Sequence, residues 1–587
     1  MAGPTAAGRK DGSDQLFASA RLFLLLQLAS RLGTFALNQF LIRITSPDVF
    51  GATTIQFELL MGLILTAARE GVRCVILREG NRIQSARTTE NGQCVPSTVL
   101  LPPNEQVAHN LSFVAVAIGA LFDVSLSFFY IRHASSTLRS SPHFAPTVTL
   151  FAVGGILELL SEPLFNRAQV LGNVQLRVRA EGLAILANCA TILACMVKPE
   201  WFGVGRHLGS TYGLMAYGWG RLSFGLVILL CYVYAFHRSI GARRTRALLW
   251  PRKAIVHGQS RYLSPKGISI SWAMGKQAML KHVMGESDKI AVARLGTLED
   301  QGGYALASNY GSLILRILFN PVEEASRITF SKTLGHILSA QDGSVMSLSV
   351  DDENALQSAS SMLAGILRLH ILLGLFFATF GPPLSRSAIY LLAGDRWACG
   401  TTAPIILGAY ACYIPVLGIN GIAEGFLTAT AGPRQLGTYN WIIMLSSATF
   451  IMSLWLLQWV PALHQTALVW SSALSIGVRA AYSWWYMLWF FSLQPSAKHA
   501  ANMAPTAILP STPSLITFAV SAYLLRAALA SARVGGSCPV NVRQVVPSIG
   551  IGAFFTLACL FACFTFERRK LSVALSAVRS RGKSKAS

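Results

Sequence analysis

Residues 300–327, DQGGYALASNYGSLILRILFNPVEEASR, contain an apolar run long enough to enter a bilayer. The run holds Arg316 and ends at Glu323 and Glu324. A charge at membrane depth costs from about 2.5 to more than 10 kcal/mol, so such a side chain normally faces a bundle interior or a wet cavity. Arg316 is therefore a candidate site residue, with an ion pair that only fixes packing as the alternative. Pro321 lacks a backbone donor and predicts an interrupted, kinked helix after Arg316.

The composition predicts a membrane protein. Of 587 residues, 52% are hydrophobic and only 13% are charged, and the mean hydropathy is +0.48. Apolar runs of membrane-spanning length recur along the chain and predict an all-α polytopic membrane protein with about fourteen transmembrane helices. The net charge of +23 lies mostly on alternate loops. This bias follows the positive-inside rule, so it predicts cytoplasmic termini rather than a nucleic-acid partner.

Several candidate residues come from the apolar runs themselves. Glu158 and Glu162 lie four apart on one helical face, and either bind a proton or ion or pair with basic residues such as Arg177 and Arg179. Arg69 lies near the end of a span, where snorkelling to the headgroups is the alternative. Lys276 and Lys281 lie in a weakly apolar span, which is tolerable only if that span lines a polar interior. These lysines are therefore cavity candidates.

Other patterns argue against cofactors and catalysis. The ten cysteines show no CxxC and no Cys/His cluster, so we expect neither disulfide nor metal. No GxxxxGK[ST] loop is present, so we expect no ATP hydrolysis and no cofactor. Residues 351–353, DDE, are the nearest approach to a glycosyltransferase DxD site and have the character of a solvated turn. Residues 71–109 are polar and proline-bearing, with no helical period, and are expected to form a mobile cytoplasmic insertion.

Five segments carry a resemblance to a known family. They are RLGTFALNQFLIR (31–43), AREGVR (68–73), ELLSEPLFNRAQV (158–170), residues 300–325 of the opening stretch, and YACYIPVLGINGIAEGF (410–426). Together they resemble the Rft proteins, endoplasmic reticulum membrane proteins of the multidrug/oligosaccharidyl-lipid/polysaccharide exporter superfamily. The resemblance runs from about Leu16 to Tyr486. Ser472 and Ser475 stand where the family pattern has asparagines.

The resemblance implies two pseudo-symmetric six-helix lobes around a central cavity, with two additional helices. The basic segment 237–267 is the expected hinge, and it can also touch anionic lipid headgroups. The expected divisions are a cytoplasmic N-terminal segment (1–21), a first lobe (22–236), a basic cytoplasmic linker (237–267), a second lobe (268–494), two additional helices (495–566) and a basic cytoplasmic tail (567–587).

The resemblance also marks site residues and a function. The marked positions are Arg31, Asn38, Arg69, Glu70, Glu158, Glu162, Glu181, Asp300, Gln301, Tyr304, Asn309, Arg316, Glu323, Glu324, Asn420 and Glu424. The implied role is to move, or help to move, a dolichol-pyrophosphate-linked heptasaccharide from the cytoplasmic to the lumenal leaflet for N-glycosylation. The alternative is a non-transporting scaffold associated with dolichol pathway enzymes.

The chemistry of the residues agrees with that role. A diphosphate needs cationic partners in a wet groove, which Arg31, Lys276, Lys281, Arg316 and Arg368 can supply, while asparagines and tyrosines suit sugar hydroxyls. Lys583 and Lys585 in the closing KSKAS form either a dilysine retrieval signal of the endoplasmic reticulum or a generic basic tail.

Overall fold

The computed structural model describes residues 37–90, 101, 103–197, 213–256, 259–340, 350–492, 508–531, 538 and 542–568. Within these ranges ten helices are long and apolar enough to cross a membrane. The predicted all-α polytopic membrane protein is thereby confirmed, while the count of about fourteen spans stays a prediction. The chain forms two compact units, Met1–Ala293 and Arg294–Ser587. This boundary lies within the range predicted for the second lobe, and the predicted divisions remain untested.

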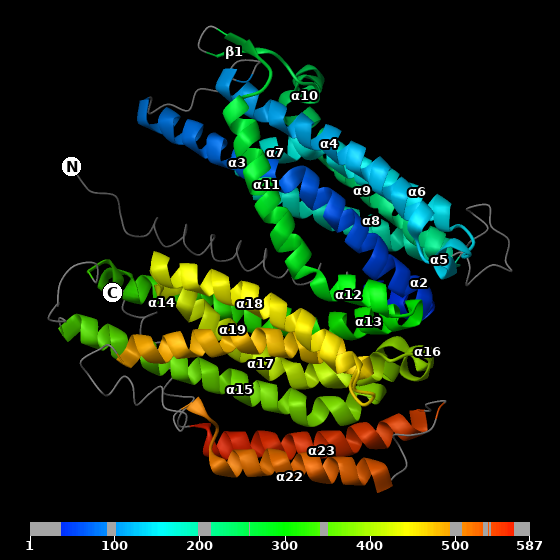
Figure 1. The fold of residues 1–587 in the computed structure, drawn as a ribbon, viewed down its shortest axis with the longest axis vertical. Helices are drawn as coiled ribbons and strands as arrows, with labels where there is room; N and C mark the ends of the chain where they lie inside the picture. Colours follow the sequence, from blue (N-terminus) through cyan, green and yellow to red (C-terminus); the bar gives the residue numbers. More distant parts are fainter. Residues whose placement is uncertain are drawn as a thin grey trace, which may run out of the picture. The chain divides into compact units, whose positions relative to one another are not determined.

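The first unit consists of helices and one small hairpin (Figure 1). Residues 37–44 are helical. The elements that follow are α2 (Pro47–Gly51), η1 (Ala52–Phe57), α3 (Glu58–Glu90), α4 (Pro103–His133), α5 (Ser136–Arg139), α6 (Phe144–Leu160), α7 (Glu162–Val170), α8 (Val174–Val197), α9 (Gly213–Ile240), α10 (Ala242–Leu248), β1 (Ala254–Val256), β2 (Gln259–Arg261), α11 (Pro265–Gly285) and α12 (Ser287–Leu295), which ends just past the boundary.

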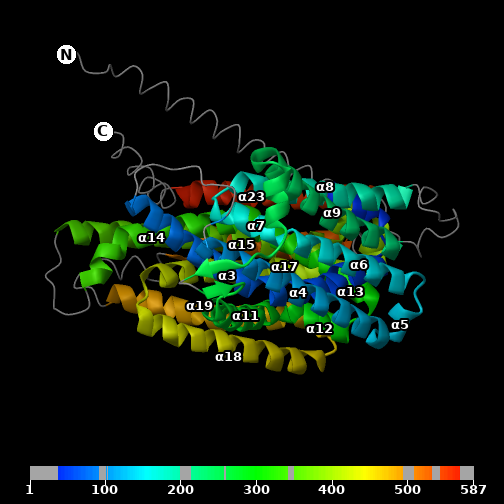
Figure 2. The ribbon, with the colours of Figure 1, turned by 90° about the horizontal axis from the view of Figure 1, so that it is seen from above.

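Close glycine contacts set the helix crossings of the first unit. α9 packs along both α6 and α8, and the three lie side by side in both views (Figures 1 and 2). A Cβ on Gly225 of α9 would lie 2.2 Å from the carbonyl oxygen of Gly154 on α6. A Cβ on Gly71 of α3 would lie 2.2 Å from the carbonyl oxygen of Ser271 on α11. Without side chains at these points, the backbones approach closely.

The segment 71–109 differs from its prediction. α3 continues to Glu90 and α4 begins at Pro103, so much of the expected insertion is helical, and residues 91–100 and 102 lie outside the described part. The prediction relied on an apolar helical period, which detects only amphipathic helices. The stretch REGNRIQSARTTE (78–90) is polar but rich in good helix formers.

The basic linker 237–267 contains α10 and the antiparallel β1–β2 hairpin. Asn110 of α4 donates to the carbonyl oxygens of Arg252 and Tyr262, each at 2.7 Å. These bonds fix both flanks of the hairpin to α4. α11 then packs along α3 within the first unit.

The second unit is also helical (Figure 1). Its elements are α13 (Leu298–Ile314), η4 (Leu315–Phe319), α14 (Asn320–Ala340), α15 (Val350–Ala393), α16 (Asp395–Cys399), α17 (Ala403–Thr430), α18 (Pro433–Gln458), η5 (His464–Thr466), α19 (Ala467–Ser492), α22 (Thr512–Ser531) and α23 (Val542–Phe566). Residues 351–353 belong to the first turn of α15 and not to a turn in a linker, since acidic residues stabilise a helix N-terminus.

The opening stretch of the sequence is not broken at Pro321. α13, η4 and α14 run on from Leu298 to Ala340, and η4 is a π-helical turn. A wider turn just before a proline accommodates the missing donor and the ring without ending the helix. The first unit has a similar π turn, η1, where Thr53 also donates to the carbonyl oxygen of Val49 at 2.8 Å.

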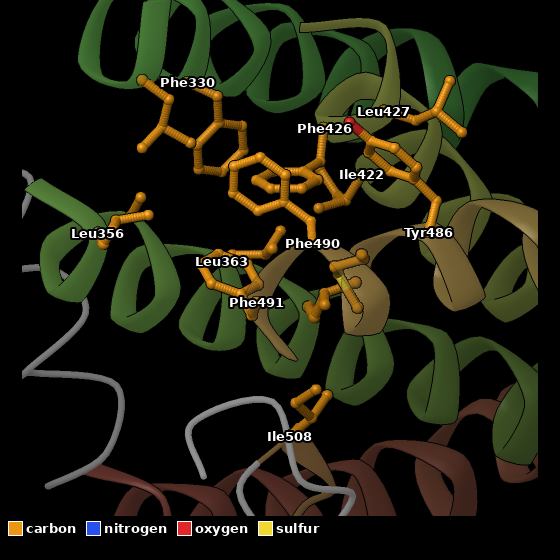
Figure 3. Close-up of a cluster of buried hydrophobic side chains, with 14 of the residues drawn as sticks. Phe330, Leu356, Leu363, Ile422, Phe426, Leu427, Tyr486, Phe490, Phe491 and Ile508 are labelled. Atoms are coloured by element: carbon orange, nitrogen blue, oxygen red, sulfur yellow. The ribbon is translucent and has the colours of Figure 1, made fainter. Parts of the chain in front are cut away.

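Aromatic side chains fill the core of the second unit. Phe426 of α17 lies 5.3 Å from Phe330 and 5.3 Å from Phe490, measured between ring centroids. Figure 3 shows these rings meeting, with Phe491 and Tyr486 beside them. Since α15 and α19 both pack along α17, this core holds α17 rigidly.

The α22–α23 hairpin is tied to the rest of its unit at both of its ends, to α15 at one end and to α16 at the other. At one end the buried Glu567 lies 3.5 Å from Arg368 of α15 and accepts a hydrogen bond from the Ser511 amide. Burial alone would raise the pKa of Glu567, but these partners hold that pKa below its usual value. At the other end a disulfide joins Cys399, at the end of α16, to Cys538.

The disulfide corrects the prediction that none would form. The two cysteines are 139 residues apart and share no sequence motif, so spacing could not pair them. Gly394, with φ 97°, turns the chain from α15 into α16. That left-handed conformation favours glycine, and Cys399 comes one short helix later.

Candidate functional site

A cluster of charged side chains lies inside the first unit. We call Arg69, Arg73, Glu158, Glu162 and Arg221 the first ionic cluster. Glu158 accepts from Arg69 and from Arg221, each at 2.5 Å. Glu162 accepts from Arg73 at 2.5 Å and lies 3.5 Å from Arg69. Three arginines therefore surround two carboxylates.

Local structure positions both carboxylates. α6 ends at Leu160 and α7 begins at Glu162, with Ser161 between them. Glu162 thus lies in the first turn of α7, where a negative charge is favourable. The close contact of Gly154 with the α9 backbone at Arg221 brings α9 within reach of Glu158. Arg73 also lies over the Phe165 ring, 4.0 Å from its centroid.

The basic partners of Glu158 and Glu162 differ from the arginines that the sequence suggested. Glu158 and Glu162 do pair with basic residues, but these are Arg69, Arg73 and Arg221. Arg177 instead pairs with Glu181 at 2.8 Å, on the exposed surface of α8. Arg69 reaches inward to both carboxylates, so the alternative of snorkelling to the headgroups is wrong for it. Sequence spacing favoured a nearby loop because it does not reveal which helices pack together.

A second cluster lies inside the second unit. We call Glu323, Asn420, Glu424, Tyr439 and Arg479 the second ionic cluster. One guanidinium nitrogen of Arg479 donates to both oxygens of Glu424, at 2.6 and 2.7 Å. Asn420 donates to Glu424 at 2.9 Å, and Arg479 also donates to the Tyr439 hydroxyl at 3.2 Å. Glu323 of α14 lies against Gly421, where a Cβ would be 2.6 Å from its carboxylate.

The two clusters have a similar arrangement of charged residues but differ in their charge. In each, a glutamate on one helix (α6 or α17) pairs with an arginine on a later helix (α9 or α19). The first cluster gathers three arginines around Glu158 and Glu162, with Glu70 at its edge, 3.7 Å from Arg73, whereas the second has two carboxylates and one arginine. The first therefore suits an anionic ligand, and the second suits hydroxyl groups or a cation.

Four contributing residues were not among the sequence-predicted site residues: Arg73, Arg221, Tyr439 and Arg479. The arginines Arg221 and Arg479 each interrupt an apolar run that is the last of its predicted six-helix half. An unexplained charge at matching places in two halves was a usable signal.

Arg316 has local partners. Its guanidinium donates to the Ser312 hydroxyl at 2.7 Å and to the Asn309 side-chain oxygen at 3.0 Å. The arginine is exposed, and within the described side chains no carboxylate pairs with it. The alternative of a structural ion pair with Glu323, in the same unit, is thus wrong. Glu324 is exposed, 4.0 Å from Arg327.

The remaining candidates are scattered over the two units. Lys276 and Lys281 are exposed on α11, and Lys276 lies 5.9 Å from the Trp272 ring centroid. Glu70 lies 3.7 Å from Arg73, at the edge of the first ionic cluster. Asn38 is half-buried on the helical segment 37–44. Arg31 lies outside the described residues.

Arg368 is occupied by contacts within the second unit. Its side chain is buried, donates to the Leu509 carbonyl and lies close to Glu567. We therefore do not count it among the cations available to a ligand. Within the part of the chain that the structure describes, no group of histidine, cysteine, aspartate or glutamate side chains is arranged to hold a metal.

Comparisons with solved structures identify the fold. The chain is similar to a structure titled "Lipid II flippase MurJ, inward closed conformation", with a TM-score of 0.52 and 10% identity over 93% of this chain and 99% of that one. It is also similar to an inward-facing multidrug resistance MATE family transporter of the MOP superfamily, with a TM-score of 0.51 and 11% identity over 78% of this chain and 94% of that one. At these identities the likeness concerns the fold alone.

Comparisons with curated proteins identify relatives. Those named "Man(5)GlcNAc(2)-PP-dolichol translocation protein RFT1" include one from Schizosaccharomyces pombe, 30% identical over 81% of this chain and 84% of its own length. Another, from Xenopus tropicalis, is 25% identical over 93% of this chain and 94% of its own. The family model described as Rft protein matches residues 15–576. Since that match covers nearly the whole sequence, the chain belongs to the Rft protein family.

Proposed function

We propose that this protein moves, or assists the movement of, a dolichol-pyrophosphate-linked oligosaccharide from the cytoplasmic to the lumenal leaflet of the endoplasmic reticulum membrane. The names of its relatives supply the substrate, Man(5)GlcNAc(2)-PP-dolichol. The observation that carries the proposal is the convergence of three partly exposed arginines, Arg69, Arg73 and Arg221, in the first ionic cluster.

A diphosphate is the charged part of such a lipid, and the bilayer interior opposes its passage. Arginine is suited to phosphate because its planar fork donates two parallel hydrogen bonds. The side chains of Arg69, Arg73 and Arg221 remain 17–20% exposed. An incoming phosphate can therefore share these guanidinium groups with Glu158 and Glu162.

The second ionic cluster suits the sugars. Glu424, Asn420 and Tyr439 supply the carboxylate, amide and hydroxyl groups that hydrogen-bond sugar hydroxyls. Arg316 and Asn309 offer a further exposed polar pair on α13 and η4. Asn38, Glu70, Lys276, Lys281, Glu323 and Glu324 complete the proposed contacts. The role is transport without chemical conversion, in a multi-pass protein of the endoplasmic reticulum with both termini cytoplasmic.

A scaffold for dolichol pathway enzymes is the alternative. It is favoured by one observation, that Arg69, Arg73 and Arg221 are each already paired with a carboxylate. Such saturated pairs are also what a purely structural role requires.

Reconstitution separates the two functions. Purified protein in phosphatidylcholine vesicles is given a fluorescent Man(5)GlcNAc(2)-PP-dolichol analogue, and the fraction reaching the second leaflet is followed over time. A transporter accelerates transfer over protein-free vesicles, and Arg69→Lys with Arg73→Lys slows it, because lysine keeps the charge but loses the fork. Arg177→Lys, at an exposed pair on α8, is the matched control. If wild-type protein gives no acceleration, the scaffold is the better account.

A further inference from the structure

The second unit contains a cavity away from its ionic cluster. The cavity has a volume of about 550 Å³ and lies where α15 and α22 end and where α17, α19 and α23 begin. Gly408 of α17 packs closely against Pro382 and Ser385 of α15, and these residues form one side of the cavity. The α22–α23 hairpin supplies the remaining wall, and that hairpin lies along α15 in Figure 1.

The cavity is basic and amphipathic. Arg386 of α15 and Arg526 of α22 line it, together with serine and threonine hydroxyls, and no aspartate or glutamate is among the described residues that line it. Ile405, Trp470 and Leu529 give it an apolar wall. Two guanidinium groups beside apolar side chains near a membrane favour an anion with an alkyl portion.

We propose that this cavity binds the phosphate group of a membrane lipid, with the adjoining part of the lipid chain against Ile405, Trp470 and Leu529. Its volume is that of a pocket for a drug-sized ligand, so it holds a phosphate and the first part of a chain rather than a whole oligosaccharide. No residue of the two ionic clusters is among the described residues that line this site, and an anionic phospholipid and a dolichyl diphosphate both carry a phosphate that it would recognise.

The disulfide indicates which leaflet supplies the lipid. Cys399 follows α15 and Cys538 precedes α23, so the bond lies at the same end of the unit as the cavity. Disulfides persist in oxidising compartments such as the lumen of the endoplasmic reticulum. The bond also ties the hairpin that carries Arg526 to α16. The cavity therefore faces the lumenal leaflet.

Photocrosslinking tests the site. Full-length protein in phosphatidylcholine vesicles is labelled with a photoactivatable phosphatidylinositol, and the labelled peptides are identified by mass spectrometry. We expect labelling of the peptides around Arg386 and Arg526. The double change Arg386→Gln and Arg526→Gln should lower labelling at least about tenfold, since charge-assisted hydrogen bonds are lost. Arg434→Gln, at an exposed arginine at the opposite end of the unit, should leave it unchanged.

Lysine variants and competing lipids distinguish loss of the site from misfolding and identify the lipid class. Arg386→Lys with Arg526→Lys restores the charge and should recover most of the labelling, which a merely misfolded protein would not do. Competition by unlabelled phosphatidylinositol identifies a phospholipid, and competition by dolichyl diphosphate alone identifies the translocated lipid class. Labelling that neither anionic lipid displaces, or that the glutamine changes leave intact, overturns the proposal.

Discussion

Glu158 accepts hydrogen bonds from arginines on two different helices, and this double pairing determines what a substitution there does. Glu158→Gln removes the charge that balances Arg69 and Arg221. Breaking a buried pair costs about 3–5 kcal/mol because it leaves an uncompensated charge. We expect the steady-state amount of protein to fall, as measured by immunoblotting.

A second substitution checks the reason for that loss. Glu181→Gln removes a carboxylate from an exposed pair in the same unit, and surface pairs contribute only about 0–1 kcal/mol. Its abundance should match wild type. Adding Arg221→Gln to Glu158→Gln should recover part of the lost protein. No recovery would mean that Glu158 acts through something other than charge balance.

Arg316 calls for the opposite prediction. It is exposed and bonded to Asn309 and Ser312 of its own helix, so Arg316→Gln should leave abundance near normal. If Arg316 contacts the diphosphate, complementation of cells lacking the protein should fail, because charge-assisted hydrogen bonds worth about 1.5–3 kcal/mol each are lost. Immunoblotting and a glycosylation assay on the same cells measure both. A stable, fully active variant would remove Arg316 from the proposed site.

Sequence reasoning at the scale of residues found charges but not partners. Glu158 and Glu162 stand out because carboxylates are rare in apolar runs. Their partners Arg69 and Arg73 lie 89 positions away in the sequence. Only the packing of α3 against α6 and α7 brings them together, and helical periodicity contains no information about that packing.

At the scale of elements, glycine contacts explain how the ionic pairs form. Gly225→Ala places a methyl group against the Gly154 carbonyl oxygen of α6, and overpacking of this kind costs about 1–3 kcal/mol. We expect a lower thermal unfolding temperature in detergent. Gly182→Ala in α8 meets nothing within 4 Å and should be neutral or stabilising, since alanine favours a helix over glycine. Equal effects of the two changes would contradict this account of the crossing.

The helix boundaries show which features local sequence patterns can predict and which they cannot. The apolar runs at 145–165 and 402–428 correspond to α6 and α17, because a bilayer requires such runs whatever the tertiary structure. Pro321 suggested a broken helix, yet the chain continues through the π turn η4. A single proline has two solutions, a kink or a wider turn, and the neighbouring helices decide between them.

For the whole molecule, composition was sufficient to predict a polytopic helical protein, and the motif segments were sufficient to predict the family. The pairing of Cys399 with Cys538 was not predictable. Both cysteines lie in short segments between apolar runs, and nothing in the sequence shows that α16 and the α22–α23 connection meet. That pairing nevertheless carries information about orientation.

The disulfide and the span order together predict the sidedness of the protein. The predicted spans formed by α17, α18, α19 and α22 separate Cys399 from Cys538, and four predicted crossings return the chain to the same side. An oxidising compartment places that side in the lumen. Between Ser260 of β2 and Cys399 lie three predicted spans, formed by α11, by α13 with η4, and by α15, which predicts that Ser260 is on the cytoplasmic side. This agrees with the basic character of 237–267.

Cysteine labelling in sealed microsomes tests this orientation. Cys538→Ser frees Cys399, which a membrane-impermeant maleimide should label only after the lumen is opened with detergent. Ser260→Cys, at an exposed position, should be labelled in intact microsomes, with peptide mass spectrometry separating both sites from the other cysteines. Because three predicted spans separate Ser260 from Cys399, the two labelled residues must lie on opposite sides of the membrane, whichever side is the lumen. Labelling of both from the same side would therefore overturn the span assignment between α11 and α15, while exchange of the two sides would overturn only the orientation.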